Sequence, residues 1–240
     1  TEINNNRCNE APEKSAQKDA QKSFFKLAPF CKGDSTIVIL FSFEASRRFR
    51  GRRAGEYSRI LFRLNQHIVK YFLENKETVL DDPQVNSACI VKISLQQTNL
   101  QKYHRARIES VSGDEIGVFF VDVGERTSVT RELILDIPEQ FMKVPETAVE
   151  GKLGRIIPSG GSTFPNNVLD KIKSKVLRKE IVLSVSKGES TTAEMEALLI
   201  EVDQGVEECI NSWLVFEGDA YFTESQRMSN ESKLPISCRN

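Results

Sequence analysis

The chain has 240 residues, a formal net charge of −1, 39% hydrophobic residues and 28% charged residues. This composition predicts a folded, globular chain with one large domain or two small ones. No stretch approaches the roughly 20 apolar residues of a membrane-spanning helix, so we expect no membrane partner. Five scattered cysteines without a CxxC pair favour reduced thiols over disulfides or zinc. With only two histidines and no cysteine beside either, we expect no metal site and no cofactor.

The first third of the chain predicts an arm, a strand and a helix. Residues 1–22 are polar, lack the apolar core of a secretory signal and predict a disordered arm. The run Ser35–Phe43 is β-branched and aromatic, which predicts a largely buried strand. Residues 56–74 predict an amphipathic helix. Its expected inward face consists of Tyr57, Ile60, Leu61, Leu64, Ile68, Tyr71 and Phe72.

Between that strand and helix lies a basic cluster with an interleaved aromatic, Phe49. Basic runs of this kind can bind nucleic acid through phosphate contacts and base stacking. The competing interpretation is a solvated hairpin or loop with no ligand. The residues of the candidate nucleic-acid site are Arg47, Arg48, Arg50, Arg52 and Arg53.

Residues 87–137 predict a meander of short strands. The strands expected are 87–95, 103–111, 115–123, 126–129 and 133–137, separated by short polar connections. Several short strands at close spacing favour a small barrel. Such a barrel is too small to hold a ligand inside, so its binding surface must lie at a rim.

The pattern changes after Pro138. We expect a strand over 151–158, a helix opened by Pro165, strands over 180–187 and 194–202, a helix over 206–214 and a disordered tail over 223–240. The first helix should face inward with Val168, Leu169, Ile172 and Val176, and the last with Val206, Ile210, Trp213 and Leu214. Strands on both sides of the meander favour a barrel inserted within a second module.

Three segments resemble one family. Tyr103–Val129 (YHRARIESVSGDEIGVFFVDVGERTSV) resembles the Tudor core, whose form is WYRA-x-V, a turn, then V-x-F-x-DYGN. Leu133–Pro158 resembles the continuation of an extended Tudor domain, and Gly205–Ala220 resembles its closing helix. The resemblance spans about residues 35–222. It implies an α+β, mostly β fold, in which a small Tudor barrel is joined to a staphylococcal-nuclease-like barrel with helices.

The resemblance divides the chain into five parts. It implies that 23–80 is the first part of the nuclease-like module with a linker helix, 81–145 the Tudor barrel, and 146–222 the second part of the module. The arm (1–22) and the tail (223–240) lie outside. Active nucleases of this fold need carboxylates that hold a metal, and no such set aligns here. We therefore expect no catalytic residue.

The resemblance also implies a ligand and a place in the cell. Members of this family bind Arg-containing peptides, commonly with symmetric dimethylarginine in an aromatic cage. Frequent partners are the tails of PIWI-type Argonautes in cytoplasmic, perinuclear germ granules, where these modules are piRNA-pathway scaffolds. The family's four cage positions fall on Ile93, His104, Phe120 and Val123, and its Asn position falls on Glu125. Only Phe120 is a full aromatic, so the cage is degenerate.

Glu125 suggests a different preference. A carboxylate accepts two N–H bonds from an unmodified guanidinium, whereas methylation blocks part of that fork. We therefore expect a peptide site that does not require dimethylarginine. Asp122 has two interpretations, a carboxylate that stabilises the turn through local N–H groups and a ligand contact. Arg105 and Arg107 are expected on the barrel surface or in ion pairs. The alternative function is RNA binding by the Arg47–Arg53 cluster, and self-association is left open.

Overall fold

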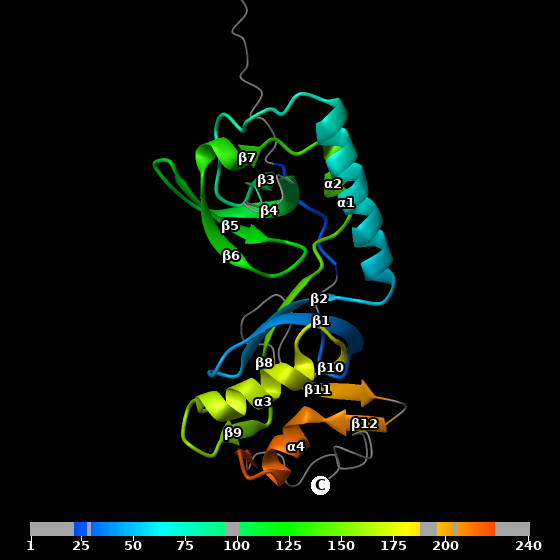
Figure 1. The fold of residues 1–240 in the computed structure, drawn as a ribbon, viewed down its shortest axis with the longest axis vertical. Helices are drawn as coiled ribbons and strands as arrows, with labels where there is room; N and C mark the ends of the chain where they lie inside the picture. Colours follow the sequence, from blue (N-terminus) through cyan, green and yellow to red (C-terminus); the bar gives the residue numbers. More distant parts are fainter. Residues whose placement is uncertain (1–21, 28–29, 95–100, 188–195, 204–205, 224–240) are drawn as a thin grey trace, which may run out of the picture.

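A computed structural model describes residues 22–27, 30–94, 101–187, 196–203 and 206–223. Two β-barrels lie one above the other, with a long helix beside the upper one (Figure 1). The strands are β1 (Ser35–Phe43), β2 (Arg48–Arg53), β3 (Ala88–Ser94), β4 (Gln101–Ser112), β5 (Glu115–Phe120), β6 (Arg126–Thr130), β7 (Ile134–Leu135), β8 (Ala148–Leu153), β9 (Ile156–Pro158), β10 (Glu180–Lys187), β11 (Glu196–Asp203), β12 (Val206–Cys209) and β13 (Ala220–Phe222). The helices are α1 (Glu56–Glu74), α2 (Glu139–Met142), α3 (Asn166–Val176) and α4 (Ile210–Phe216), with a 3-10 turn, η1, at Arg131–Leu133.

The small barrel is an antiparallel sheet in the order β6-β5-β4-β3-β7. Its strands alternate inward and outward residues, as a half-buried strand must. The inward-facing side chains pack together as the core of this barrel. This core consists of Cys89, Val91, Ala106, Ile108, Ile116, Val118, Phe120 and Ile134. Burial raises the pKa of the Cys89 thiol to about 12, which keeps it protonated and inert.

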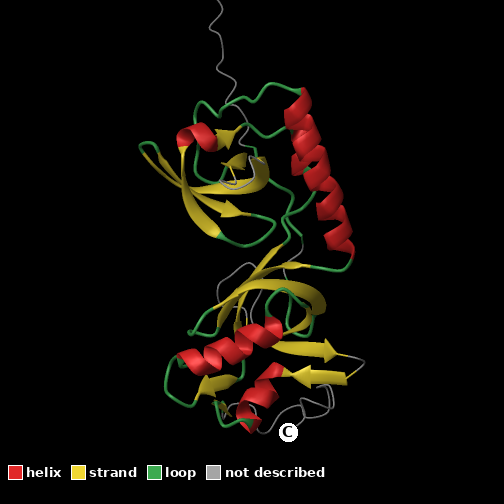
Figure 2. Cartoon of the chain, in the orientation of Figure 1, coloured by secondary structure: helices red, strands yellow, loops and turns green. Residues whose placement is uncertain are grey.

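The second barrel takes its strands from both sides of the small barrel in sequence. Its sheet runs β10-β1-β2-β8-β11, a pairing of β10 with β11 closes it, and β12 extends it from β11. Helices α3 and α4 lie near it, at the end away from the small barrel (Figures 1 and 2). The core shared by these elements includes Phe49, Ile172, Ile181, Leu199, Ile210 and Leu214. The small barrel is therefore an insertion in the sequence of the second barrel, whose strands precede and follow it along the chain.

Helix α1 connects the second barrel to the small one and packs along the side of the small one (Figure 2). It buries Leu61, Leu64, Ile68 and Phe72, which repeat every three to four residues on one face. The Phe72 ring stacks on Tyr103 of β4, with centroids 4.7 Å apart. The helix bounds match the predicted range of 56–74, but Ile60 of the expected inward face is 42% exposed.

Several predicted elements differ from the structure. The predicted helix at 206–214 is wrong in its first part, because Val206–Cys209 forms β12 and pairs with β11. The predicted strand at 151–158 is two strands, broken at Arg155, whose φ is +61°. The strand predicted for 115–123 ends at Phe120, and the chain turns at once.

The predicted arm and tail fall almost wholly outside the described residues. Lys22 and Thr223 are the residues of these two segments that the structure describes. The carbonyl of Lys22 accepts a backbone hydrogen bond from Ala88, and the amide of Thr223 donates one to the carbonyl of Arg155. No described helix has the length and apolar character needed to cross a membrane.

Candidate peptide site at the rim of the small barrel

Three predicted site residues, Phe120, Val123 and Glu125, lie at the end of β5 and in the turn that follows it. The carbonyl of Phe120 accepts hydrogen bonds from the amides of Val123 (3.2 Å) and Gly124 (2.8 Å), and the Phe120 amide donates to Glu125 O (2.8 Å). Gly124 has φ +78°, a conformation that glycine adopts without steric cost. The turn therefore places the backbones of Val123 and Glu125 next to that of Phe120.

The aromatic part of the rim is small. His104 lies on β4, and its ring centroid is 5.2 Å from that of Phe120 at an interplanar angle of 48°. Among the described residues, this is the ring contact that Phe120 makes. Phe120 is only 6% exposed, so its ring can lie beneath a ligand but does not enclose one from the side. Ile93 and Val123 are partly buried and pack against the same core. They offer apolar contact without a ring quadrupole.

The charge state of His104 suits a cationic ligand. Burial lowers the pKa of His104, and nearby Lys102 lowers it further, while Asp122 and Glu125 act in the opposite direction. Since the pKa lies below the ordinary value of about 6.5, the imidazole is mostly neutral at pH 7. A neutral ring beside Phe120 does not repel a guanidinium.

Glu125 is the carboxylate that is free at this rim. Its side chain is exposed and makes no ion pair or side-chain hydrogen bond with any described residue. The guanidinium of the neighbouring Arg126 forms ion pairs with other carboxylates, those of Glu109 (2.9 Å) and Glu150. Glu125 can therefore accept hydrogen bonds from a cation that approaches the rim.

Asp122 is engaged by a buried arginine. Its two oxygens accept hydrogen bonds from Nε (2.9 Å) and Nη2 (2.6 Å) of Arg105, and Thr147 lies within 3.4 Å. The Arg105 guanidinium is fully buried, so Arg105 does not lie on the barrel surface and instead forms the expected ion pair. It also donates to the carbonyls of Phe141 (2.9 Å) and Pro145 (2.9 Å). Asp122 thus fixes the turn through a distant arginine and not through local N–H groups.

Arg107 on the same strand also makes an ion pair, with Glu146 at 2.7 Å. Arg126 and Glu150 pair across the two barrels, and a Cβ on Gly124 would lie 3.2 Å from the carbonyl of Gly51. The rim turn is therefore held against strand β2 of the second barrel. Sequence reasoning did not find these links, because each joins residues far apart in the chain.

The basic cluster is largely engaged within the fold. Arg48–Arg53 forms strand β2, which pairs with β1 in a hairpin of the second barrel, so the hairpin of the competing interpretation is present, with Phe49 buried in the core. Arg47 donates to the carbonyls of Leu153 (3.3 Å) and Ile156. Arg50 pairs with Glu44, and with Glu150 at 3.6 Å.

Two further arginines of the cluster lie over rings. The guanidinium of Arg53 is 3.8 Å from the centroid of Phe30, and that of Arg52 is 5.6 Å from that of Phe41. Burial lowers the pKa of Arg53. Of the five, Arg48 is exposed and the other four are partly buried. The five arginines therefore do not present a single free basic patch.

The described part of the chain holds no group of three or more His, Cys, Asp and Glu side chains placed to bind a metal ion. Of the cysteines in this part, Cys89 and Cys209 are buried and Cys31 is exposed.

The fold and the rim turn define an extended Tudor domain. The extended Tudor domain of human TDRD1, solved with a symmetrically dimethylated E2F peptide, superposes with a TM-score of 0.67 at 17% identity, over 84% of this chain and 95% of that one. That of Drosophila melanogaster Papi, solved with an unmethylated Piwi N-terminal peptide, gives 0.63 at 19% identity, over 79% and 100%. The predicted fold class is confirmed.

The family model of the Tudor domain matches residues 32–155, just over half of the chain. The chain belongs to the Tudor domain family. The ATP-dependent RNA helicase TDRD9 of Mus musculus is 44% identical over 64 residues, 27% of this chain. The matched segment spans only 5% of that helicase.

Proposed function

We propose that this chain is a non-catalytic scaffold module that binds an Arg-containing tail of a protein partner at the rim of the small barrel. An N-terminal tail of a PIWI-type Argonaute is the partner that we propose. The observation that carries the proposal is the exposed Glu125 carboxylate, which no described residue pairs and whose charge acts on His104, the residue in ring contact with Phe120. A guanidinium there would gain a charge-assisted fork and a shallow aromatic contact.

The same geometry supports tolerance of unmethylated arginine. A cation–π contact contributes roughly 0.5–2 kcal/mol per good ring, and a full cage multiplies that contribution. Here one ring is buried, one is an imidazole, and Ile93 and Val123 occupy the other two positions. Methylation of the arginine would remove N–H groups that donate to Glu125, and the few rings would add little cation–π attraction to offset that loss. We infer that dimethylarginine is not required.

The cellular setting follows from the proposed partner. A module that binds such a tail would act in the piRNA pathway, in the cytoplasm and in perinuclear germ granules. Fractionation and imaging of the tagged full-length protein would test this placement. Signal outside the granules, with no overlap with a PIWI-type Argonaute, would contradict it.

RNA binding through the Arg47–Arg53 cluster is the second candidate. The basic composition of the segment favours it, although internal contacts already engage four of the five arginines. RNA binding should weaken steeply and log-linearly with salt, since counterions are released. Peptide binding with apolar contacts should change less. A titration of single-stranded RNA at two salt concentrations would separate the two functions.

The peptide function is tested by Glu125→Gln, with a synthetic Arg-containing peptide as the probe in calorimetry. Losing one charge-assisted hydrogen-bonding partner should cost about 1–2 kcal/mol, or roughly 5- to 30-fold in Kd. Glu115→Gln is the matched control, because Glu115 is also exposed but lies at the opposite end of β5. Equal binding by wild type and the Glu125→Gln variant would reject this site.

A further inference from the structure

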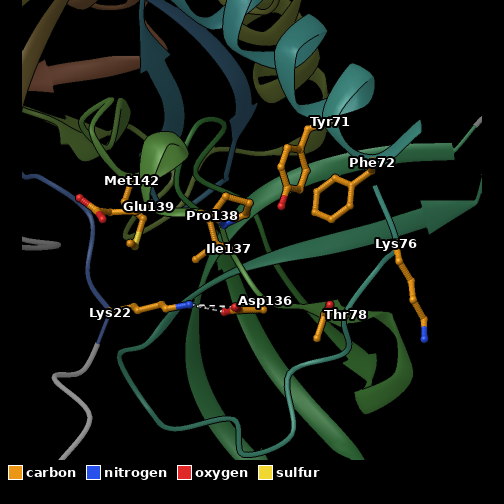
Figure 3. Close-up of a pocket in the computed structure, with 10 residues that line it drawn as sticks. All are labelled: Lys22, Tyr71, Phe72, Lys76, Thr78, Asp136, Ile137, Pro138, Glu139 and Met142. Carbon is orange, nitrogen blue, oxygen red and sulfur yellow. Dashed lines mark hydrogen bonds and ion pairs between the residues drawn. The ribbon is translucent and has the colours of Figure 1, made fainter. Parts of the chain in front are cut away.

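A groove runs along the flank of α1, where the helix faces the segment 136–144. It consists of two hollows, of about 630 Å³ and 510 Å³, that share Tyr71. Volumes of this size suit peptide side chains or small ligands. Figure 3 shows the first hollow, with Tyr71 and Phe72 of the helix opposite Ile137, Pro138 and Met142.

The groove exists because α1 packs on the barrel through one face only. Phe72 stacks on β4, while the edge of the Tyr71 ring meets Phe141 at a centroid distance of 5.6 Å. The segment after β7 turns at Pro138 into the short helix α2, which leaves space beside Tyr71. Ile60, which is 42% exposed, continues the apolar lining toward the start of the helix. Apolar groups therefore line both hollows without being fully covered.

The unpaired charges around the groove are mainly positive. Lys22 pairs with Asp136 at 2.6 Å, as Figure 3 shows, and Lys70 pairs with Glu74 at 3.8 Å. Three charged lining residues make no ion pair with any described residue. They are Arg63, Lys76 and Glu139, which leaves an excess of one positive charge.

The groove and the rim site lie on opposite faces of β4. Successive residues of a strand point to opposite faces. Tyr103 belongs to the core beneath α1, whereas the next residue, His104, contacts Phe120 at the rim. The rim presents a free carboxylate, whereas the unpaired charges at the groove sum to one positive charge. One ligand side chain therefore cannot satisfy both sites.

We propose that this groove is a second docking site, for a partner segment with a large apolar side chain flanked by carboxylates. The apolar side chain enters the hollow between Tyr71 and Met142. The carboxylates meet Arg63 and Lys76, and one of them can compete with Asp136 for Lys22. This ligand is opposite in charge to the arginine-containing tail proposed for the rim, so the two sites would bind different segments.

The proposal is tested by NMR with two synthetic hexapeptides, Glu-Glu-Leu-Phe-Glu-Glu and the charge-reversed Lys-Lys-Leu-Phe-Lys-Lys. Each is titrated into the ¹⁵N-labelled chain up to about 1 mM, where weak peptide binding is detected. We expect the acidic peptide to shift amides of 60–76 and 136–144, and to bind at least about fivefold more tightly than the basic one. Absent shifts, shifts at 120–125 instead, or equal binding of the two peptides would overturn the proposal.

The variant Arg63→Glu/Lys76→Glu should weaken the acidic peptide about fivefold or more. The control Lys173→Glu/Lys187→Glu makes the same change in net charge on the second barrel and should leave binding unchanged. Equal loss in both variants would mean a nonspecific charge effect, and so would overturn the proposal. Groove shifts that follow protein concentration without peptide would mean that a second copy covers the groove, which would overturn it as well.

Discussion

Replacing Arg105 with Leu removes the group that joins the rim turn to the segment before β8. The Arg105 side chain is fully buried and donates two hydrogen bonds to Asp122 and three to backbone carbonyls. Removing one partner of a buried ion pair costs about 3–5 kcal/mol, because the other charge is left uncompensated. For a chain of this size, a loss of about 4 kcal/mol lowers Tm by roughly 8–16 °C.

The assay is thermal and urea unfolding followed by far-UV circular dichroism. Arg107→Leu is the matched control on the same strand, since its side chain is 22% exposed and pairs with Glu146. A partly exposed pair contributes about 1 kcal/mol or less. The double variant Arg105→Leu/Asp122→Leu should be less destabilised than Arg105→Leu alone, because no orphaned carboxylate remains. An Arg105→Leu variant no less stable than the Arg107→Leu variant would refute this reasoning.

Three further predictions concern single residues. Burial and a 2.7 Å hydrogen bond to Glu77 raise the pKa of Tyr103 to about 12. The contribution of this shift to the stability of the fold should therefore be complete below pH 10 and lost as pH rises through 12. In an ultraviolet titration, the Tyr103→Phe variant should lack the tyrosine ionisation seen near pH 12. A Cβ on Gly51 would lie 2.3 Å from a backbone oxygen of β1. Gly51→Ala should therefore lower the free energy of unfolding by about 1–3 kcal/mol, measured by thermal unfolding. Gly160→Ala is the control and should be neutral, because no atom lies within 4 Å of a Cβ there. Because burial lowers the pKa of His104 below its ordinary value of about 6.5, binding of an Arg peptide should be constant above pH 7 and weaken in acid as the ring becomes cationic. Affinity that rises as the pH is lowered would contradict the place of His104 in the site.

Elements with strong local patterns could be predicted from the sequence. The helix at 56–74 and the strand at 35–43 have the predicted bounds, because each carries an uninterrupted apolar period or a β-branched run. The start of the last helix could not be predicted. Residues 206–209 are a strand because they pair with β11, with Ile200 opposite Cys209, and that pairing is not visible in a short window.

The rim site could be predicted only in part. The resemblance supplied the positions of His104, Phe120 and Glu125, but the role of Asp122 depends on Arg105, a residue 17 positions away. The exposure of Ile60 was missed because helical spacing does not say how wide the covered face of a helix is. These features depend on packing between segments that are far apart in the chain, and local sequence patterns do not show which segments pack together.

We propose that a free carboxylate and few rings at this rim let the chain bind arginine without requiring its methyl groups. The most direct test of this claim is calorimetric titration of the chain with one Arg-containing peptide in unmethylated and symmetrically dimethylated forms. We predict that the unmethylated peptide binds as tightly as the dimethylated one, or more tightly. A clear gain in affinity on dimethylation, of about tenfold or 1.4 kcal/mol, would contradict the claim.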